Sequence, residues 1–353
     1  MIDFQKSNLH VLNYSIPVKK VVPLKDLKEH LYTLPDHPDW VPYRTSYYKE
    51  NWGFCASQRT LEELEDGDYE VLIDSSLEPG TMTYGEYFLP GEGKAEVLIS
   101  THCCHPSLCN DNLSGMALST FLAKFLGSQP SLRYSYRFLF IPGTIGSITW
   151  LALNEERVNQ IEHGLVLASV GDPGKSTYKR SRRGDAEIDQ AVANVLKHSG
   201  QEYDIQDFSP YGYDERQYCS PGFNLPVGCL SRTPYEQYPE YHTSADNLDL
   251  VRPEFLLDSF SKCLAAFDIL ENNKRYVSKN PKCEPQLGKR GLYGAFGGKK
   301  DSNPYELAML WVLNLSDGEH SLLEIAERSG FGFGLIKEVA EMLLNYDLLA
   351  EYQ

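Results

Sequence analysis

The 353-residue sequence predicts a three-layer α/β/α sandwich built around a mostly parallel, mixed sheet. From Ala95 onward, short runs of branched aliphatic residues alternate with segments of helical periodicity, which is the order expected of βαβ units. Strands are expected at residues 95–100, 136–142 and 163–170. Helices are expected after Asp111, from near Ser147, and over residues 185–198 and 253–272.

Smaller units flank the sandwich. Residues 24–34 have the spacing of a peripheral amphipathic helix, and residues 50–93 combine alternating apolar residues with Pro-Gly turn signals, which predicts a small β-rich insert. Behind a basic, glycine-rich linker, the tail has three helical segments in the pattern of a winged helix. We therefore predict a main α/β domain at residues 1–49 and 94–298. A β-rich subdomain is expected to be inserted at residues 50–93, and a winged helix is expected at residues 299–353.

The charge of the chain argues against nucleic acid as a partner. The net charge is −16 and the isoelectric point is near 5.0, which repels phosphate backbones. Residues 301–353 contain two Lys or Arg against ten Asp or Glu, a net charge of −8. A helix that reads DNA needs cations that face phosphates. We therefore expect the winged helix to contact protein and to offer a surface for homo-oligomers.

The composition predicts a cytoplasmic protein without a membrane partner. The eight cysteines are irregularly spaced, and the amino-terminal segment lacks the apolar core of a signal peptide. Irregular cysteines of this kind are typical of a reducing compartment. No apolar run approaches the about 20 residues that span a bilayer.

The stretch from Thr101 to Leu126 has the composition of a functional site. An apolar strand leads into a loop that contains His102 and His105, and Asp111 then opens a helix. All three side chains should converge at the carboxyl end of the strand, where open α/β sheets bind ligands. Two imidazoles and a carboxylate form a plausible set of ligands for a first-row metal.

Two other interpretations of this stretch stay open. A histidine pair in a loop is commonly solvated or hydrogen-bonded rather than bound to metal. Cys103, Cys104 and Cys109 could also be ligands, but adjacent cysteines do not have the spacing of a structural zinc site. We expect these three to be buried small apolar residues.

A second loop-rich region, residues 210–251, carries further candidate site residues. Long loops within a compact domain are commonly functional. Asp214 and Glu215 are adjacent in this region, and His242 precedes a helix cap.

The order of these motifs resembles that of the zinc exopeptidase clan that includes bacterial leucyl aminopeptidase and glutamate carboxypeptidase. There, a strand ends in a His ligand, a D-x-x-S-G phrase supplies a bridging Asp, and a late YHT phrase supplies the last His. This chain has His102, then DNLSG from Asp111, then YHTSADN from Tyr241. The chain is also similar, over nearly its whole length, to an aminopeptidase-like family that carries an inserted domain and a winged helix and often accompanies polysaccharide biosynthesis genes. That similarity rests on the phrases TIGSITWL, GDPG, KRSRRGDAEID, DERQYCSPGFNLPVG and EYHTSADN.

The departures from the clan alter the expected site. The aminopeptidases have Glu-Glu after the second strand, as general base and second-metal ligand, whereas this chain has Pro-Gly-Thr-Ile-Gly-Ser at residues 142–147. Cys104 replaces the Asp of the clan's His-x-Asp phrase. What stands instead is His102-x-x-His105, similar in spacing to the His-x-x-Glu of single-zinc carboxypeptidases. The consistent inference is one metal ion per chain.

We therefore expect one zinc ion held by His105, Asp111 and His242, with His102 as a fourth ligand or as an orienting partner. Mixed nitrogen and oxygen ligation would also admit manganese or nickel. Glu215, and after it Asp214, are the expected proton acceptors, although acidic residues in such loops are also commonly solvated or paired. Asp172 lies near the place where the relatives have another carboxylate ligand.

Two classes of function follow from these residues. The first is a metallohydrolase that cleaves an amide bond in a peptide or in an N-acyl substrate. The second is a metal-binding pseudoenzyme that serves assembly through its winged helix, which the missing Glu-Glu pair favours.

Overall fold

The computed structural model describes residues 1–292 and 304–352. Its centre is a seven-stranded sheet in which the four middle strands, β11, β8, β6 and β7, run parallel. β5 joins one edge antiparallel to β7, and β9 joins the other antiparallel to β11. The predicted mixed, mostly parallel sheet is confirmed. In spatial order the strands are β10 (Tyr203–Gln206), β9 (Ser176–Lys179), β11 (Val227–Ser231), β8 (Ile161–Leu167), β6 (Glu96–His102), β7 (Ser135–Ile141) and β5 (Gly85–Leu89).

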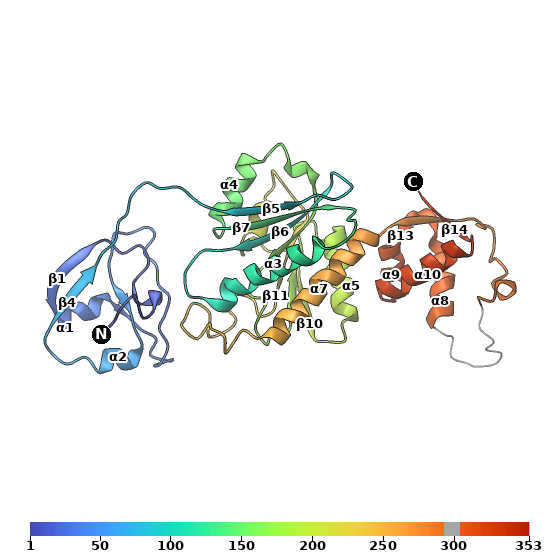
Figure 1. The fold of residues 1–353 in the computed structure, drawn as a ribbon. Helices are drawn as coiled ribbons and strands as arrows, with labels where there is room; N and C mark the ends of the chain where they lie inside the picture. Colours follow the sequence, from blue (N-terminus) through green and yellow to red (C-terminus); the bar gives the residue numbers. More distant parts are fainter. Residues whose placement is uncertain (293–303, 353) are drawn as a thin grey trace.

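Helices cover both faces of this sheet. α3 (Gly115–Leu126), α5 (Glu187–His198) and α7 (Pro253–Asn272) lie side by side on one face (Figure 1). α4 (Ile145–Leu153) and α6 (Glu215–Tyr218) lie on the other.

The strand β6 shows why both faces are apolar. All seven of its residues are buried, and successive side chains point to opposite sides. Ile99 belongs to the larger core with Phe267 of α7, whereas Leu98 belongs to a second core with Trp150 of α4 and Tyr218 of α6. The predicted three-layer sandwich is therefore confirmed.

The parallel strands deliver their loops to a single edge. β6, β7, β8 and β11 end at His102, Ile141, Leu167 and Ser231, and the loops that follow them meet there. This edge faces the amino-terminal part of the chain (Figure 1).

The amino-terminal part has its own small sheets and core. β1 (Val18–Pro23) pairs with β4 (Asp68–Ile73), and β2 (Leu31–Tyr32) pairs with β3 (Phe54–Cys55). Trp52, Val71 and Ile73 are buried in the core that these strands enclose. The short helices of this part are η1 (Asn8–His10), α1 (Leu24–Leu27), η2 (Lys28–His30) and α2 (Gln58–Glu62).

The predicted helix over residues 24–34 is wrong in its extent. Only Leu24–Leu27 is α-helical, and a 3-10 turn at Lys28–His30 leads into β2. Pairing with β3 takes Leu31 and Tyr32 out of the helix, because tertiary contacts override the weak preference of a short helical pattern.

Strand pairing crosses the predicted domain boundaries. β4, from the expected insert at 50–93, pairs with β1, and β5, from the same segment, joins the central sheet. The division into 1–49 with 94–298, 50–93 and 299–353 remains a prediction, and its boundary at 298 and 299 lies outside the described residues.

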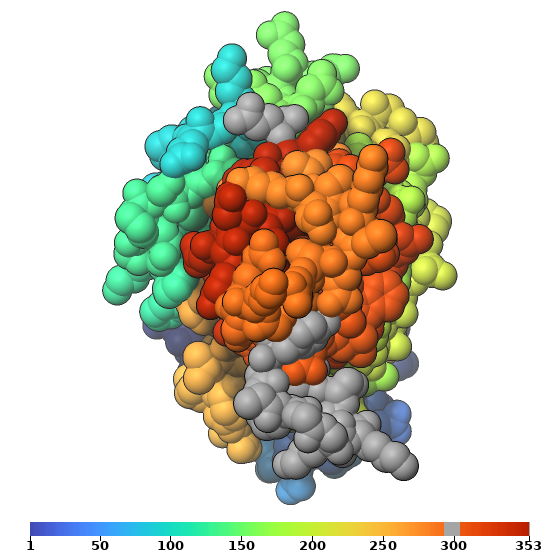
Figure 2. All heavy atoms as spheres, turned by 90° about the vertical axis from the view of Figure 1, so that its right-hand side faces the viewer, coloured from blue at the N-terminus to red at the C-terminus, as the bar shows by residue number. Residues whose placement is uncertain are grey.

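The winged-helix part begins before residue 299. β12 (Arg275–Ser278) follows α7 directly and pairs with β13 (Asp317–Ser321) and β14 (Leu349–Glu351). The three predicted helices are present, and Figure 2 shows this part lying over one end of the molecule. They are α8 (Pro304–Leu315), α9 (Leu322–Ser329) and α10 (Phe333–Asn345).

Within the described ranges, 1–292 and 304–352, no helix combines the length and the apolar character that crossing a bilayer requires.

The packing of α7 on the sheet should dominate stability. Phe267 is 1% exposed and packs its ring 5.6 Å from that of Tyr136. We expect Phe267→Ala to lower the free energy of unfolding by about 3–5 kcal/mol, measured by urea denaturation, because it removes a large buried side chain. Phe121→Ala on α3 is the control, since its side chain is 62% exposed and should cost less than about 1 kcal/mol. Equal losses in the two variants would contradict this account of the core.

Candidate metal centre

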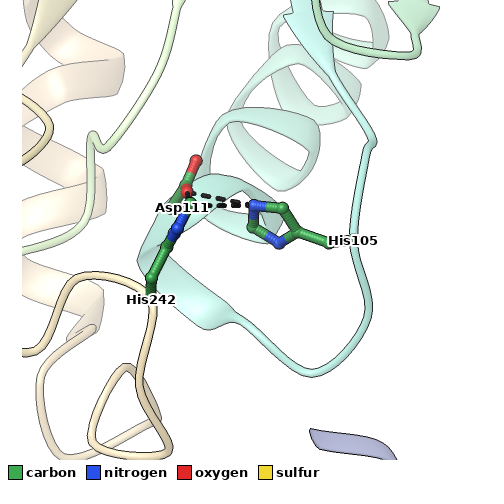
Figure 3. Close-up of side chains that lie close together, drawn as sticks. All are labelled: His105, Asp111 and His242. Carbon is green, nitrogen blue, oxygen red and sulfur yellow. Dashed lines mark hydrogen bonds and ion pairs between the residues drawn. The ribbon is translucent and has the colours of Figure 1, made fainter. Parts of the chain in front are cut away.

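Three side chains from two distant loops meet at the carboxyl edge of the sheet. His105 comes from the loop after β6, Asp111 from the turn before α3, and His242 from the long loop after β11 (Figure 3). The Nε2 atoms of His105 and His242 lie 3.4 and 3.1 Å from Oδ2 of Asp111, and they lie 3.1 Å from each other. Among the His, Cys, Asp and Glu side chains of the described residues, these three form the group whose spacing suits a metal ion.

These separations fit a tetrahedral zinc site. Zinc binds imidazole nitrogen and carboxylate oxygen at about 2.0–2.1 Å, so ligand atoms at two corners of a tetrahedron lie about 3.3–3.4 Å apart. The three observed separations, 3.1 to 3.4 Å, are close to that edge length. Two imidazole nitrogens that face each other and one carboxylate oxygen can share a cation between them. The residues present therefore fit a single metal ion with a fourth corner open.

His102 lies on the other side of the same carboxylate. Its Nε2 is 2.8 Å from Oδ1 of Asp111, and its Nδ1 is 3.3 Å from the side-chain amide nitrogen of Asn112. His102 is fully buried, and its ring stacks on that of Tyr213 at 4.4 Å. Oδ2 of Asp111 faces the other two imidazoles, and Oδ1 faces His102. His102 is therefore in the position of a partner that orients Asp111. Such outer partners fix the direction of a metal ligand.

Asn112 and Asp246 hold the turn that carries Asp111. The Asn112 amide donates to the Leu167 carbonyl, and its oxygen accepts from the Ser169 backbone. The Asp246 carboxylate accepts from the backbone nitrogens of Asn110 and Asp111. Both side chains are buried, so their hydrogen bonds fix the turn against the sheet and against the loop of His242.

The amino-terminal segment holds His242 in place. The Tyr43 backbone nitrogen donates to the His242 carbonyl at 2.7 Å, and Pro42 forms a bridge with Thr243. The Tyr43 ring lies 4.5 Å from that of His105 and 5.2 Å from that of His242. His242 has a φ of 57°, which a non-glycine residue adopts at a cost and which such contacts can maintain. The His242 side chain stays 32% exposed, so the centre is open to solvent on that side.

The electrostatics of the cluster favour an added cation. Burial would raise the pKa of Asp111, but its three imidazole partners outweigh this and hold the pKa well below its usual range. Burial would lower the pKa of His105, but Asp111 and Cys104 raise it to about 9. The pKa of His102 is raised by the same two neighbours against the effect of burial. In a metal-free centre, protons therefore supply the positive charge that a metal ion would bring.

The cysteines near the centre differ from their prediction. Cys103 and Cys109 are half-buried and Cys104 is exposed, because the loop runs along the edge of the sheet instead of entering the core. Desolvation would raise the pKa of the Cys104 thiol, but the imidazoles of His102 and His105 lower it to about 7.

The two acids expected to accept protons have other partners. Oδ1 of Asp214 accepts from the Thr144 backbone and the Ser147 hydroxyl at 2.8 Å, so it holds the first turn of α4. Glu215 forms an ion pair with Lys179. No hydrogen bond or ion pair between the described residues joins either acid to His105, Asp111 or His242. Their catalytic roles remain predictions.

Asp172 also stays outside the cluster. Its carboxylate is 1% exposed and accepts from the Asn110 amide and from the backbone nitrogens of Gly174 and Thr233. It therefore connects the loops after β6, β8 and β11.

Sequence reasoning did not single out Asn112, Asp246 or Tyr43 as parts of the centre. Asn112 and Asp246 are of residue types that commonly cap helices. Their sequence signal is position: Asn112 follows a ligand directly, and Asp246 lies four residues after another. Tyr43 has no such signal.

Comparison with solved structures defines the class of the protein. A crystallised protein of Clostridium acetobutylicum, provisionally described as a peptidase, has 53% identity and a TM-score of 0.93 over 99% of this chain and 79% of that chain. A zinc aminopeptidase from Bacillus subtilis has 14% identity and a TM-score of 0.52 over 74% of this chain and 78% of that chain, and so shares the fold. The protein is an aminopeptidase-like α/β sandwich with an added winged helix.

Within this class, the chain belongs to the family described as domain of unknown function (DUF4910), whose profile matches residues 4–273. Residues 274–351 match a winged helix-turn-helix family. A Clostridium acetobutylicum protein, provisionally named a polysaccharide biosynthesis protein with aminopeptidase-like domain, is 55% identical over 349 residues, which cover 99% of this chain and 80% of that protein.

The cluster predicts a defined metal stoichiometry. We expect the full chain to bind one zinc ion, and His105→Ala, Asp111→Asn and His242→Ala each to weaken binding at least tenfold, measured by titration against a chromophoric chelator. His320→Ala, in the winged helix, is the control and should bind as the unaltered chain does. Unchanged affinity in both His105→Ala and His242→Ala would show that the metal lies elsewhere.

The raised pKa of His105 predicts that protons compete with metal. Below about pH 9 the metal-free imidazole carries a proton that a metal ion must displace, so affinity should rise with pH. We expect the apparent zinc affinity to increase about tenfold per pH unit for each displaced proton and to level off above about pH 9. Titrations in buffers from about pH 6 to about pH 10 measure this, and a flat profile would contradict the proposed ligands.

Proposed function

We propose that this protein is a zinc-dependent hydrolase that cleaves a peptide or N-acyl amide bond with one metal ion per chain. The observation that carries the proposal is the triangle of two imidazole nitrogens and one carboxylate oxygen at tetrahedral spacing. It lies at the sheet edge where an α/β fold binds its ligands. Three protein ligands with one open corner are typical of a catalytic rather than a structural zinc site.

Zinc in such a site lowers the pKa of bound water to about 7 and polarises a carbonyl. The residues of this chain would bind the metal ion and orient its ligands. His105 and His242 would bind as neutral imidazoles, and Asp111 would supply the negative charge. His102 and Asn112 would keep Oδ2 of Asp111 turned toward the two imidazoles. The exposed side of His242 would admit the substrate.

Of the two acids, Asp214 is the one that we propose as the proton acceptor. Burial raises the pKa of its carboxyl, and the nearby His102 only partly offsets this effect. Its Oδ2 has no partner among the described residues. A carboxylate with a raised pKa is suited to accept a proton near neutral pH. Glu215 is paired with Lys179 and lines a cavity that includes none of the three candidate ligands.

The alternative function, a metal-binding pseudoenzyme, is favoured by Gly143. An added Cβ there would lie 3.8 Å from the Cβ of His102 and 3.7 Å from the Cβ of Cys104, at ordinary contact distance, so the position lies beside the loop of the centre. A glycine leaves the centre without a carboxylate from the loop after β7. In this alternative, the acidic surface of the winged helix would bind another protein chain, including a second copy of this one.

Turnover separates the two functions. We expect the zinc-loaded chain to hydrolyse a member of a panel of aminoacyl and N-acyl amides, with activity lost on adding a chelator and restored by zinc. Asp214→Asn should lower kcat at least a hundredfold while zinc stoichiometry is kept, because it removes the proton acceptor. Unchanged kcat in Asp214→Asn would exclude that role, and stoichiometric zinc without turnover of any amide would favour the pseudoenzyme.

A further inference from the structure

A second cavity lies next to the metal centre. It has a volume of about 360 Å³ and lies over β9 and β11, beneath the loops at residues 206–213 and 234–237. We call it the tyrosine cavity, because Tyr211, Tyr213 and Tyr235 line it. Its size is at the lower end of the range of about 300–1,000 Å³ that is usual for small-molecule sites.

Tyr213 separates the tyrosine cavity from the metal centre. One part of this residue lines the cavity, while its ring stacks on His102 and its hydroxyl lies 2.7 Å from that of Tyr241. Tyr241 in turn stacks on His242 at 3.9 Å. A molecule in the cavity would therefore contact the same side chain that packs against the metal centre.

The lining combines flat aromatic rings with hydrogen-bonding groups. The ring of Tyr235 lies 5.6 Å from that of Tyr211 and 5.2 Å from that of Tyr213, so the three rings form one wall. Polar groups also line the cavity, namely Gln206, Asp207, Ser209, Ser231 and Gln237. Aromatic faces with convergent polar groups suit a ligand that has both C–H faces and hydroxyls.

Glu215 is the most unusual group of the cavity. It is 1% exposed, one of its oxygens is paired with Lys179, and Oε2 has no hydrogen-bond partner among the described residues. A buried carboxylate oxygen without a donor is costly and indicates a missing partner. Gly212 lies directly over the ion pair, where an added Cβ would clash with both side chains, so the loop is fitted to it.

The unpartnered group of this cavity is an acceptor. Lys179 already donates to the backbone carbonyls of Ser209 and Tyr211 as well as to Glu215. Oε2 of Glu215 can only accept while the carboxyl is ionised. The missing partner of Glu215 is therefore a hydrogen-bond donor, such as a hydroxyl or an amide N–H.

The charge of the lining excludes anions. Lys179 is its one cation among the described residues, against the carboxylates of Asp207, Glu215 and Glu236. A phosphate or a carboxylate would be repelled by this excess of negative charge. A neutral group rich in hydroxyls satisfies the acceptors without that cost.

We propose that the tyrosine cavity binds the sugar ring of an N-acylated amino sugar, whose amide bond extends past Tyr213 to the metal centre. This names the substrate class of the proposed hydrolase and rests on it for the reaction. In that reaction the oxygen of water joins the acyl carbon, the C–N bond breaks, and the nitrogen leaves with a proton. The products are a carboxylate and an amino sugar. Binding in the cavity does not depend on turnover.

Saturation-transfer NMR of the metal-free full chain tests the binding. The probes are N-acetylglucosamine, N-acetylgalactosamine and N-acetylmannosamine, with glucosamine as a cation and glucuronate as an anion. We expect saturable transfer to at least one N-acetylhexosamine and none to glucuronate. Transfer to no N-acetylhexosamine, or to glucosamine alone, would overturn the proposal, the latter in favour of an ammonium site.

Two variants locate that binding. Tyr235→Ala should weaken it at least tenfold, because it removes an aromatic wall at a half-buried position that folding tolerates. Glu215→Gln should weaken it severalfold, because it removes the charged acceptor while leaving the shape and the zinc stoichiometry unchanged. Tyr346→Ala, at an exposed tyrosine of the winged-helix part, is the matched control. Sugar binding that survives Tyr235→Ala would place the ligand elsewhere and overturn the proposal.

The outcomes also separate this proposal from the proposed hydrolase. Sugar binding without turnover of any amide would leave the cavity assigned and remove the hydrolase. Turnover of peptide amides without any sugar binding would support the hydrolase and remove the assignment of the cavity. In an active chain, Glu215→Gln should raise KM for an N-acylated amino sugar with little change in kcat, whereas loss of a proton acceptor would lower kcat.

Discussion

The carboxylate of Asp111 is the interaction on which the site depends. One oxygen faces the buried His102, and the other faces His105 and His242. Three imidazoles share this single negative charge, and the nitrogens of His105 and His242 also face each other. Either protons or a metal ion must supply the remaining positive charge. The lowered pKa of Asp111 and the raised pKa values of His102 and His105 express this same demand.

The rest of the fold brings these groups together and keeps them in place. The parallel strands β6 and β8 place the turn of Asp111 beside the loop after β8, where Asn112 ties the two. The loop of His242 is held from one side by Asp246 and from the other by the backbone of Tyr43. The amino-terminal part therefore helps to hold the site, although none of the three candidate ligands belongs to it. A rigid sheet edge with loops held from both sides is the arrangement expected of a site whose geometry must be kept within a fraction of an ångström.

The sequence predicts the central sandwich well because its signals are local. The buried run of β6, the apolar spacing of α3 and the Pro at the first turn of α7 each specify their element within a few residues. The strand β11 escapes this reasoning, because Val227–Ser231 is a short run inside a loop-rich region. Yet β11 supplies part of the tyrosine cavity. For the site, His105, Asp111 and His242 can be predicted as candidates from residue type and motif order. The choice between the two roles expected for His102, and the contacts of Tyr43, depend on the folded arrangement, which no local pattern encodes.

The central claim is that a single metal ion lies between His105, Asp111 and His242. The most direct measurement is a crystal of the full chain loaded with one equivalent of zinc, with anomalous diffraction collected on both sides of the zinc absorption edge. The account predicts one strong anomalous peak within bonding distance of both Nε2 atoms and of Oδ2 of Asp111. A peak bound to other residues, or no peak between these three side chains, would contradict it.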